Sequence, residues 1–148
     1  MDDKFNTIET LEKEFFENDS DFSDVNLFHT KLKADITTYK QHELPAMAVH
    51  AFSFEGLEGE RKLNYIGTAI EITHRGGDLD TVDGQVKTIL SRAINKLRAE
   101  SPLNHGNGFE NQAIEDIRID NAEIIFDRIN SVFTVIGSLE VAIGVYER

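Results

Sequence analysis

The residues best suited to chemistry lie in one short stretch: His74, Asp78, Asp80 and Asp83. An imidazole and three carboxylates are groups that bind divalent cations or transfer protons in general acid and base catalysis. The order D-L-D-T-V-D-G departs from the calcium-binding EF-hand loop, because Val82 stands where the third ligand belongs and Ile89 where the twelfth belongs. The EF-hand is therefore excluded, while an unclassified divalent site remains an alternative.

Helix capping explains the same three aspartates more simply. All three lie in or before the first turn of a stretch with helical periodicity, where carboxylates accept hydrogen bonds from free N–H groups and face the positive end of the helix dipole. The other histidines show neither H-E-x-x-H nor H-x-H spacing: His29, His42, His50 and His105. We therefore predict no bound metal and no cofactor.

Other catalytic patterns are also missing from the sequence. The chain has no cysteine, so thiol nucleophiles, thiolate metal sites and disulfides are excluded. No G-x-S-x-G motif or Walker loop occurs, and the glycines at 105–108 indicate a turn. We predict that the chain is not an enzyme. The alternative is a small acidic enzyme or ligand-binding domain that uses the cluster from His74 to Asp83.

The element that organises the chain is a long strand near its C-terminal end, Val132–Tyr146. Apolar residues take alternate positions, interrupted only by Gly137: Phe133, Val135, Leu139, Val141, Ile143 and Val145. A period of two gives one apolar face for a core, while small and polar residues occupy the other face. The strand is longer than usual and therefore needs neighbouring strands along its length.

The rest of the sequence supplies these neighbours and the helices that cover them. Residues 43–55 and 61–74 predict a hairpin around the turn G-L-E-G-E, and residues 79–97 predict an amphipathic helix. Residues 113–126 predict a strand that pairs with the last one, with a bulge or kink near Asn121 where the alternation slips by one residue. A shorter amphipathic helix is predicted at 6–18.

These elements predict an α+β fold. We expect a single, largely antiparallel sheet of about four main strands with two helices packed on one face. The whole chain, 1–148, is expected to form one domain, in which residues 19–35 are a connection or a variable arm.

The composition argues against two further classes of protein, those that bind nucleic acid and those that span a membrane. A net charge of −12, from 27 acidic and 15 basic residues, argues against sequence-specific binding of nucleic acid, which needs clustered Lys and Arg. There is no apolar run near eighteen residues, and the N-terminal stretch is acidic and amphipathic. We expect neither a membrane span nor a secretory signal, and therefore a cytosolic protein where it is made.

Taken together, three features resemble the tail terminator proteins of long-tailed bacteriophages. The first is the segment ELPAMAVHAF followed by a glycine turn and KLNYIGTAIEITH, the second is the helix LDTVDGQVKTILSRAINKL, and the third is a terminal hairpin that ends LEVAIGVYER. The resemblance covers residues 36–148 and depends on element order, on Leu44-Pro45-Ala46 and on Val145-Tyr146. None of these residues is a catalytic signature.

The resemblance implies a structural role in virion assembly. It implies a small subunit of a hexameric ring at the head-proximal end of the tail tube, with the tail tube protein and a head completion protein as partners. The subunit would act in the host cytoplasm during assembly and then in the virion. Independently of the resemblance, repulsion between subunits that each carry −12 disfavours the ring at low salt, so that a monomer is one expected state of the free protein. A neck or tail completion protein of the same assembly is the alternative within morphogenesis.

A ring built from one kind of subunit needs two different patches on each copy. The first candidate patch is the strand from residue 43 to 54 with the turn that follows, and the second is the turn at 127–131 with the outer face of the last strand. The charged residues expected at these contacts are Glu55, Glu58, Glu60, Arg61, Lys62, Asp127 and Arg128.

Overall fold

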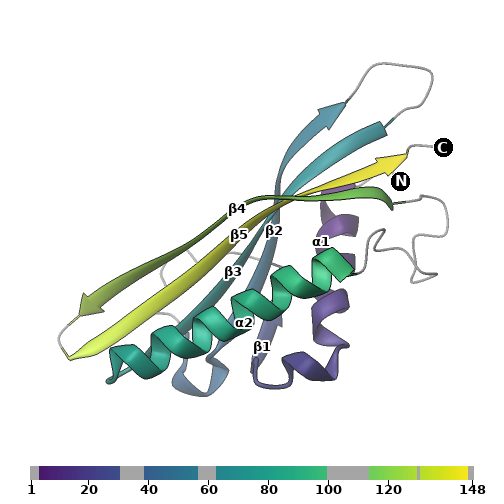
Figure 1. The fold of residues 1–148 in the computed structure, drawn as a ribbon. Helices are drawn as coiled ribbons and strands as arrows, with labels where there is room; N and C mark the ends of the chain where they lie inside the picture. Colours follow the sequence, from purple (N-terminus) through teal and green to yellow (C-terminus); the bar gives the residue numbers. More distant parts are fainter. Residues whose placement is uncertain (1–3, 31–38, 57–62, 100–113, 130, 147–148) are drawn as a thin grey trace.

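A computed structural model describes residues 4–30, 39–56, 63–99, 114–129 and 131–146 (Figure 1). In chain order the elements are α1 (Lys4–Glu17), η1 (Ser20–Phe22), β1 (Leu27–His29), η3 (Gln41–Glu43), β2 (Ala46–Gly56), β3 (Leu63–Gly76), α2 (Leu79–Ala99), β4 (Ile114–Ile129) and β5 (Val132–Tyr146). The glycine loop at 103–112 and most of the turn at 56–60 lie outside the described residues.

The strands form one mixed sheet in the order β1-β2-β3-β5-β4. The long strands β2 to β5 pair with one another in antiparallel fashion, as the two predicted hairpins require. The short strand β1 spans three residues within the stretch predicted as a connection, and it pairs in parallel with β2. The predicted α+β fold with a single sheet and two α-helices is confirmed, with five strands instead of about four.

The last strand, β5, lies inside the sheet and has a neighbouring strand on each side, as its length suggested. β5 pairs with β3 from Leu63↔Tyr146 to Gly76↔Phe133, and with β4 on its other side. The pairing with β4 shifts between Ile119 and Asn121, which confirms the predicted bulge near Asn121. Because of this shift, apolar residues before and after the bulge can face the same side of the sheet.

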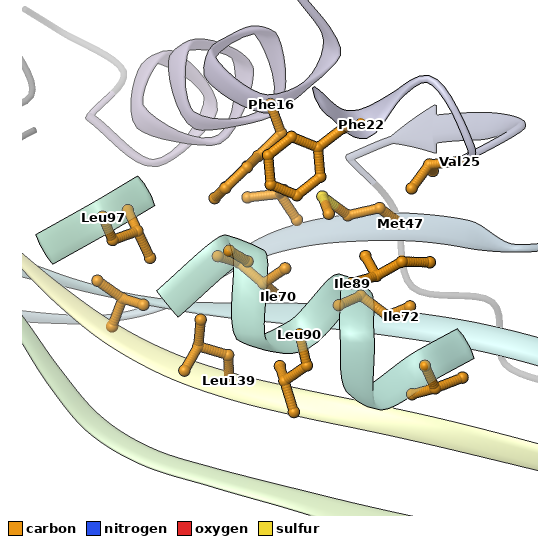
Figure 2. Packing of buried hydrophobic residues seen from close by; sticks show 14 of the residues in the cluster. Phe16, Phe22, Val25, Met47, Ile70, Ile72, Ile89, Leu90, Leu97 and Leu139 are labelled. Atoms are coloured by element: carbon orange, nitrogen blue, oxygen red, sulfur yellow. The ribbon is translucent and has the colours of Figure 1, made fainter. Parts of the chain in front are cut away.

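Both α-helices cover the same face of the sheet (Figure 1). The longer helix, α2, packs on β3 and β5 through a fully apolar buried stripe: Val82, Val86, Ile89, Leu90, Ala93 and Leu97 (Figure 2). Gly137 interrupts the alternation of β5 for a packing reason, because a Cβ atom there would lie 2.9 Å from Cγ1 of Val86. The glycine thus permits the close approach of α2 to the strand.

The N-terminal helix packs beside α2, over β2. It begins at Lys4, two residues before the predicted start, and its Phe16 packs against Phe22 of η1 with 5.2 Å between ring centroids. Phe22 and Val25 belong to the main core, so the stretch predicted as a connection or variable arm contributes to it, while 31–35 lie outside the described residues. No described helix combines the length and apolarity needed to cross a membrane.

Candidate functional site

The predicted acidic cluster is dispersed along the start of α2. Asp78 precedes the helix and accepts hydrogen bonds from the Thr81 hydroxyl at 2.6 Å and, through its carbonyl oxygen, from the Val82 N–H at 3.1 Å. Asp80 lies exposed in the first turn, and Asp83 pairs with Lys87 at 2.6 Å. Asp78 therefore lies at the cap position with its carboxylate bonded to the Thr81 hydroxyl, whereas Asp83 forms an ion pair along the helix.

His74 does not join these carboxylates. Its Nε2 lies 2.6 Å from Oε1 of Gln85, and burial of the half-exposed ring lowers its pKa below the ordinary value. Among the described residues, no group of three or more His, Asp or Glu side chains is arranged to hold a metal ion. In the structure, the stretch from His74 to Asp83 thus consists of the start of α2 and a separate contact between His74 and Gln85.

The predicted interface residues fall into two groups. Glu58, Glu60, Arg61 and Lys62 lie outside the described residues. Glu55 is exposed near the end of β2, opposite Tyr65 on β3. Asp127 and Arg128 are exposed near the end of β4, where Asp127 accepts a hydrogen bond from the Arg128 N–H and the Arg128 guanidinium lies 5.5 Å from the Phe133 ring centroid.

The strand ends that lead into the two predicted turns lie at diagonally opposite corners of the sheet. The end of β2 is next to the start of β3, through Gly56↔Asn64, and β3 starts beside the end of β5. The turn between β4 and β5 lies at the far end, where β5 starts beside Gly76. With 14 residues in β3, these ends are roughly 40 Å apart along the strands.

Each corner exposes large apolar side chains that the sequence analysis did not single out. At the β2 corner, the exposed fractions are 51% for Phe52 and 46% for Phe54. At the β4–β5 corner they are 53% for Ile125, 60% for Phe126 and 39% for Val132. The run I-I-F carried a signal, because apolar residues at consecutive positions of an edge strand cannot all face one core.

Phe52 and Phe54 flank the β2 strand on its two faces. The register shifts between Ala51 and Ser53, and a Cβ atom on Gly67 would lie 3.3 Å from the Phe52 ring and 2.1 Å from the Ser53 hydroxyl. Gly67 therefore leaves room for the side chains of Phe52 and Ser53 to lie across β3, on the face away from the helices. We name Phe52, Phe54 and Glu55 the β2 corner, and Ile125, Phe126, Arg128 and Val132 the β4–β5 corner.

A polar network occupies the sheet face near the β2 corner. The Tyr65 hydroxyl donates to Asp116 at 3.0 Å, and Arg118 lies over the Tyr65 ring while pairing with Asp120 at 2.7 Å. The hydrogen bond and charge of Asp120 raise the pKa of Arg118, with a further contribution from the charge of Glu55. These contacts order the strand ends and provide no nucleophile with an adjacent base.

The face of the sheet away from the two α-helices has small and acidic side chains. In the register of β3 and β5, Ala69 pairs with Glu140 and Glu71 pairs with Ser138. Burial raises the pKa of Glu71, and the nearby charge of His50 lowers it in part. One end of this face is buried, because Tyr39, Leu44 and Ala46 form a second, smaller hydrophobic cluster there, whereas its exposed remainder suits water or the surface of a partner.

No family model matches the chain, and no curated protein matches it.

Proposed function

We propose that this chain is a structural subunit of a phage or prophage tail terminator, which forms a ring that caps the tail tube and joins it to the head. The resemblance in element order and in the strand ends supports this role. The observation that supports it best is the exposure of large apolar side chains at two opposite corners of one sheet.

Two different patches on one molecule favour head-to-tail association. When the patch of one copy meets the other patch of the next, the contact is heterologous, and it closes into a ring if the rotation permits. The β2 corner carries Glu55, whereas the β4–β5 corner carries Arg128 beside Asp127, so apolar contact can be combined with one pairing of opposite charge. The ring proposed here joins these two corners.

The acidic composition has a use in such a ring. A tube through which DNA passes must not bind phosphates, and a subunit with a net charge of −12 repels them. The same charge opposes association of subunits at low ionic strength, so the free protein is expected to be monomeric when dilute and to form rings on the tube end. We propose the host cytoplasm during assembly, and the virion afterwards, as its location.

Light scattering over a range of protein and salt concentrations, followed by negative-stain imaging with purified tail tubes, tests this function. We expect rings at high salt or at tube ends. Monomers that form no ring and bind no tube end under any of these conditions would refute the terminator role. Binding to a head completion protein without binding to tube ends would favour the neck protein alternative.

A pair of variants tests the head-to-tail contact itself. Phe52→Asp disables the β2 corner and Phe126→Asp disables the β4–β5 corner, so neither variant alone is expected to form rings. An equimolar mixture retains one intact contact between unlike copies and should therefore give dimers that grow no further. Ser91→Asp adds the same charge on the exposed side of α2 and should leave ring formation unchanged. Rings formed by either disabled variant alone would exclude this pair of corners.

A further inference from the structure

Glu12 of α1 is buried in the core, although its sequence position suggested the polar side of the helix. Its side chain has 1% exposure, and it lies in the row Ile8, Glu12 and Phe16, whose other members are fully buried. One carboxyl oxygen, Oε1, lies 3.1 Å from the Thr68 hydroxyl, while Oε2 is buried and has no hydrogen-bond partner among the described residues. A charged carboxylate in such a place would leave most of its solvation uncompensated.

The contacts around Glu12 suit a neutral carboxyl group. The Thr68 hydroxyl lies 3.4 Å from the Val141 carbonyl oxygen as well as 3.1 Å from Glu12. A protonated Glu12 can donate a hydrogen bond to the Thr68 oxygen, while the Thr68 O–H donates to the Val141 carbonyl oxygen. Each hydrogen then has an acceptor. An ionised Glu12 would accept the hydrogen bond of the Thr68 hydroxyl, and its buried second oxygen would carry negative charge without a hydrogen bond from the described residues.

No charged group of the described residues compensates Glu12. On the elements around it, β3 presents Thr68, β5 presents a carbonyl, and β2 carries His50, which lies 3.7 Å from Glu9. Lys96 of α2 is paired with Asp19. Burial raises the pKa of Glu12 from 4.5 to about 8, the Thr68 hydrogen bond lowers it in part, and no charge contributes.

A second carboxylate connects the same helix to the edge of the sheet. Oε1 of Glu9 accepts a hydrogen bond of 3.1 Å from the Ala51 N–H. Strand β1 pairs with β2 only as far as Ala48, so Ala51 belongs to the part of the β2 edge that no described strand covers. Helix α1 therefore shields this edge as well as part of the core.

We propose that α1 is a reversible cover of the sheet, held in place by the protonated carboxyl of Glu12 and loosened when this proton is lost. Opening of α1 would uncover the β2 edge at Ala51. This inference does not depend on the proposed function.

The direction of the pH effect follows from linkage. In the docked helix Glu12 keeps its proton up to about pH 8, whereas in an opened helix it returns to its ordinary pKa near 4.5. The opened state therefore binds fewer protons between these values, and opening becomes about tenfold more favourable for each pH unit. Below pH 4.5 and above pH 8 the contribution of Glu12 is constant.

Hydrogen exchange of the full chain between pH 5 and 7 tests the cover, with rates corrected for intrinsic exchange. In the wild type, we expect α1 amides and the Ala51 amide to open about tenfold more often per pH unit. They should also exchange faster than the amides of β5. Glu12→Gln should abolish the pH dependence. Glu14→Gln, which removes a carboxylate from the exposed side of the same helix, should retain it.

Two results would overturn the inference. If α1 amides exchanged at the same rate as those of β5, the helix would leave only on global unfolding. If Glu12→Gln showed the pH dependence of the wild type, another group would control the opening. Should the variant fail to fold, carbon NMR of the Glu12 carboxyl in the wild type decides the matter, because a titration midpoint near 4.5 in place of about 8 excludes the cover.

Discussion

The two α-helices cover the same face of the same sheet, but they are held there differently. The buried stripe of α2 is wholly apolar, and it fits over β3 and β5 at Gly137. The buried row of α1 includes the carboxyl of Glu12, and a second carboxylate, Glu9, bonds the sheet edge. The buried side chains of α2 are thus wholly apolar, whereas those of α1 include a titratable carboxyl, whose protonation we propose controls the docking of α1.

Polar contacts join the two helices at one end. Lys96 of α2 pairs with Asp19 and lies 4.2 Å from the centroid of the Phe15 ring, and Arg92 pairs with Asp24 at 2.8 Å. The Lys96 hydrogen bond, together with the backbone hydrogen bond from Asp21, lowers the pKa of Asp19. The two ion pairs tie the segment after α1 to α2, whereas the Phe15 contact belongs to the docked helix itself. In the proposed opening, the segment after α1 would therefore stay attached.

The largest expected effect comes from removing apolar volume beneath α2. Leu97 is fully buried, so Leu97→Ala should lower the free energy of unfolding by about 3 to 5 kcal/mol through lost transfer energy and a cavity. Urea denaturation measures this loss. Ser91→Ala, on the exposed side of the same helix, should change stability by less than about 0.5 kcal/mol. A loss below about 1 kcal/mol for Leu97→Ala would show that α2 contributes less to the core than its burial indicates.

The next effect distinguishes α1 from α2 by its pH dependence. The folded pKa of Glu12 is raised, so its stabilising contribution is complete below pH 4.5 and is lost as pH rises toward 8. Between pH 5 and 7 this amounts to about 2 to 3 kcal/mol, which Glu12→Gln should remove. Denaturation at several pH values, with Glu14→Gln as control, isolates this term, because the lowered pKa of His74 acts in the opposite direction in both proteins.

A parallel slope for the wild type and Glu12→Gln would mean that Glu12 is already ionised in the folded protein. In that case the two helices would be docked in the same manner, and the contrast between them would disappear.

The smallest effect concerns the start of α2. Asp78→Ala removes the acceptor of the Thr81 hydroxyl and a charge at the helix N-terminus, and it should cost about 1 kcal/mol. Asp80→Ala removes only an exposed charge and should cost about 0.3 kcal/mol. Melting temperatures measured with EDTA and with Mg²⁺ or Ca²⁺ should show the same losses. A metal-dependent rise in melting temperature that Asp78→Ala abolishes would instead favour a divalent site.

Periodicity in the sequence determined the arrangement of elements. Alternating apolar residues specified β5, the stripe from Val82 to Leu97 specified α2, and the slip near Asn121 specified a bulge, because each pattern reflects a face that must be buried. The short strand β1 was not predicted, since three residues carry too little pattern and are held by pairing with β2.

Only the tertiary structure decided how particular side chains are used. Glu12 reads as a polar residue in sequence, yet β3 and β5 close over it because the position of α1 depends on contacts distant in the chain. Likewise, Phe52 and Phe126 have large apolar side chains that are typical of a core, but they lie exposed at opposite corners of the sheet. A residue type fixes what a side chain can do, whereas burial is a property of the assembled elements, and that assembly separates His74 from the aspartates near it in sequence.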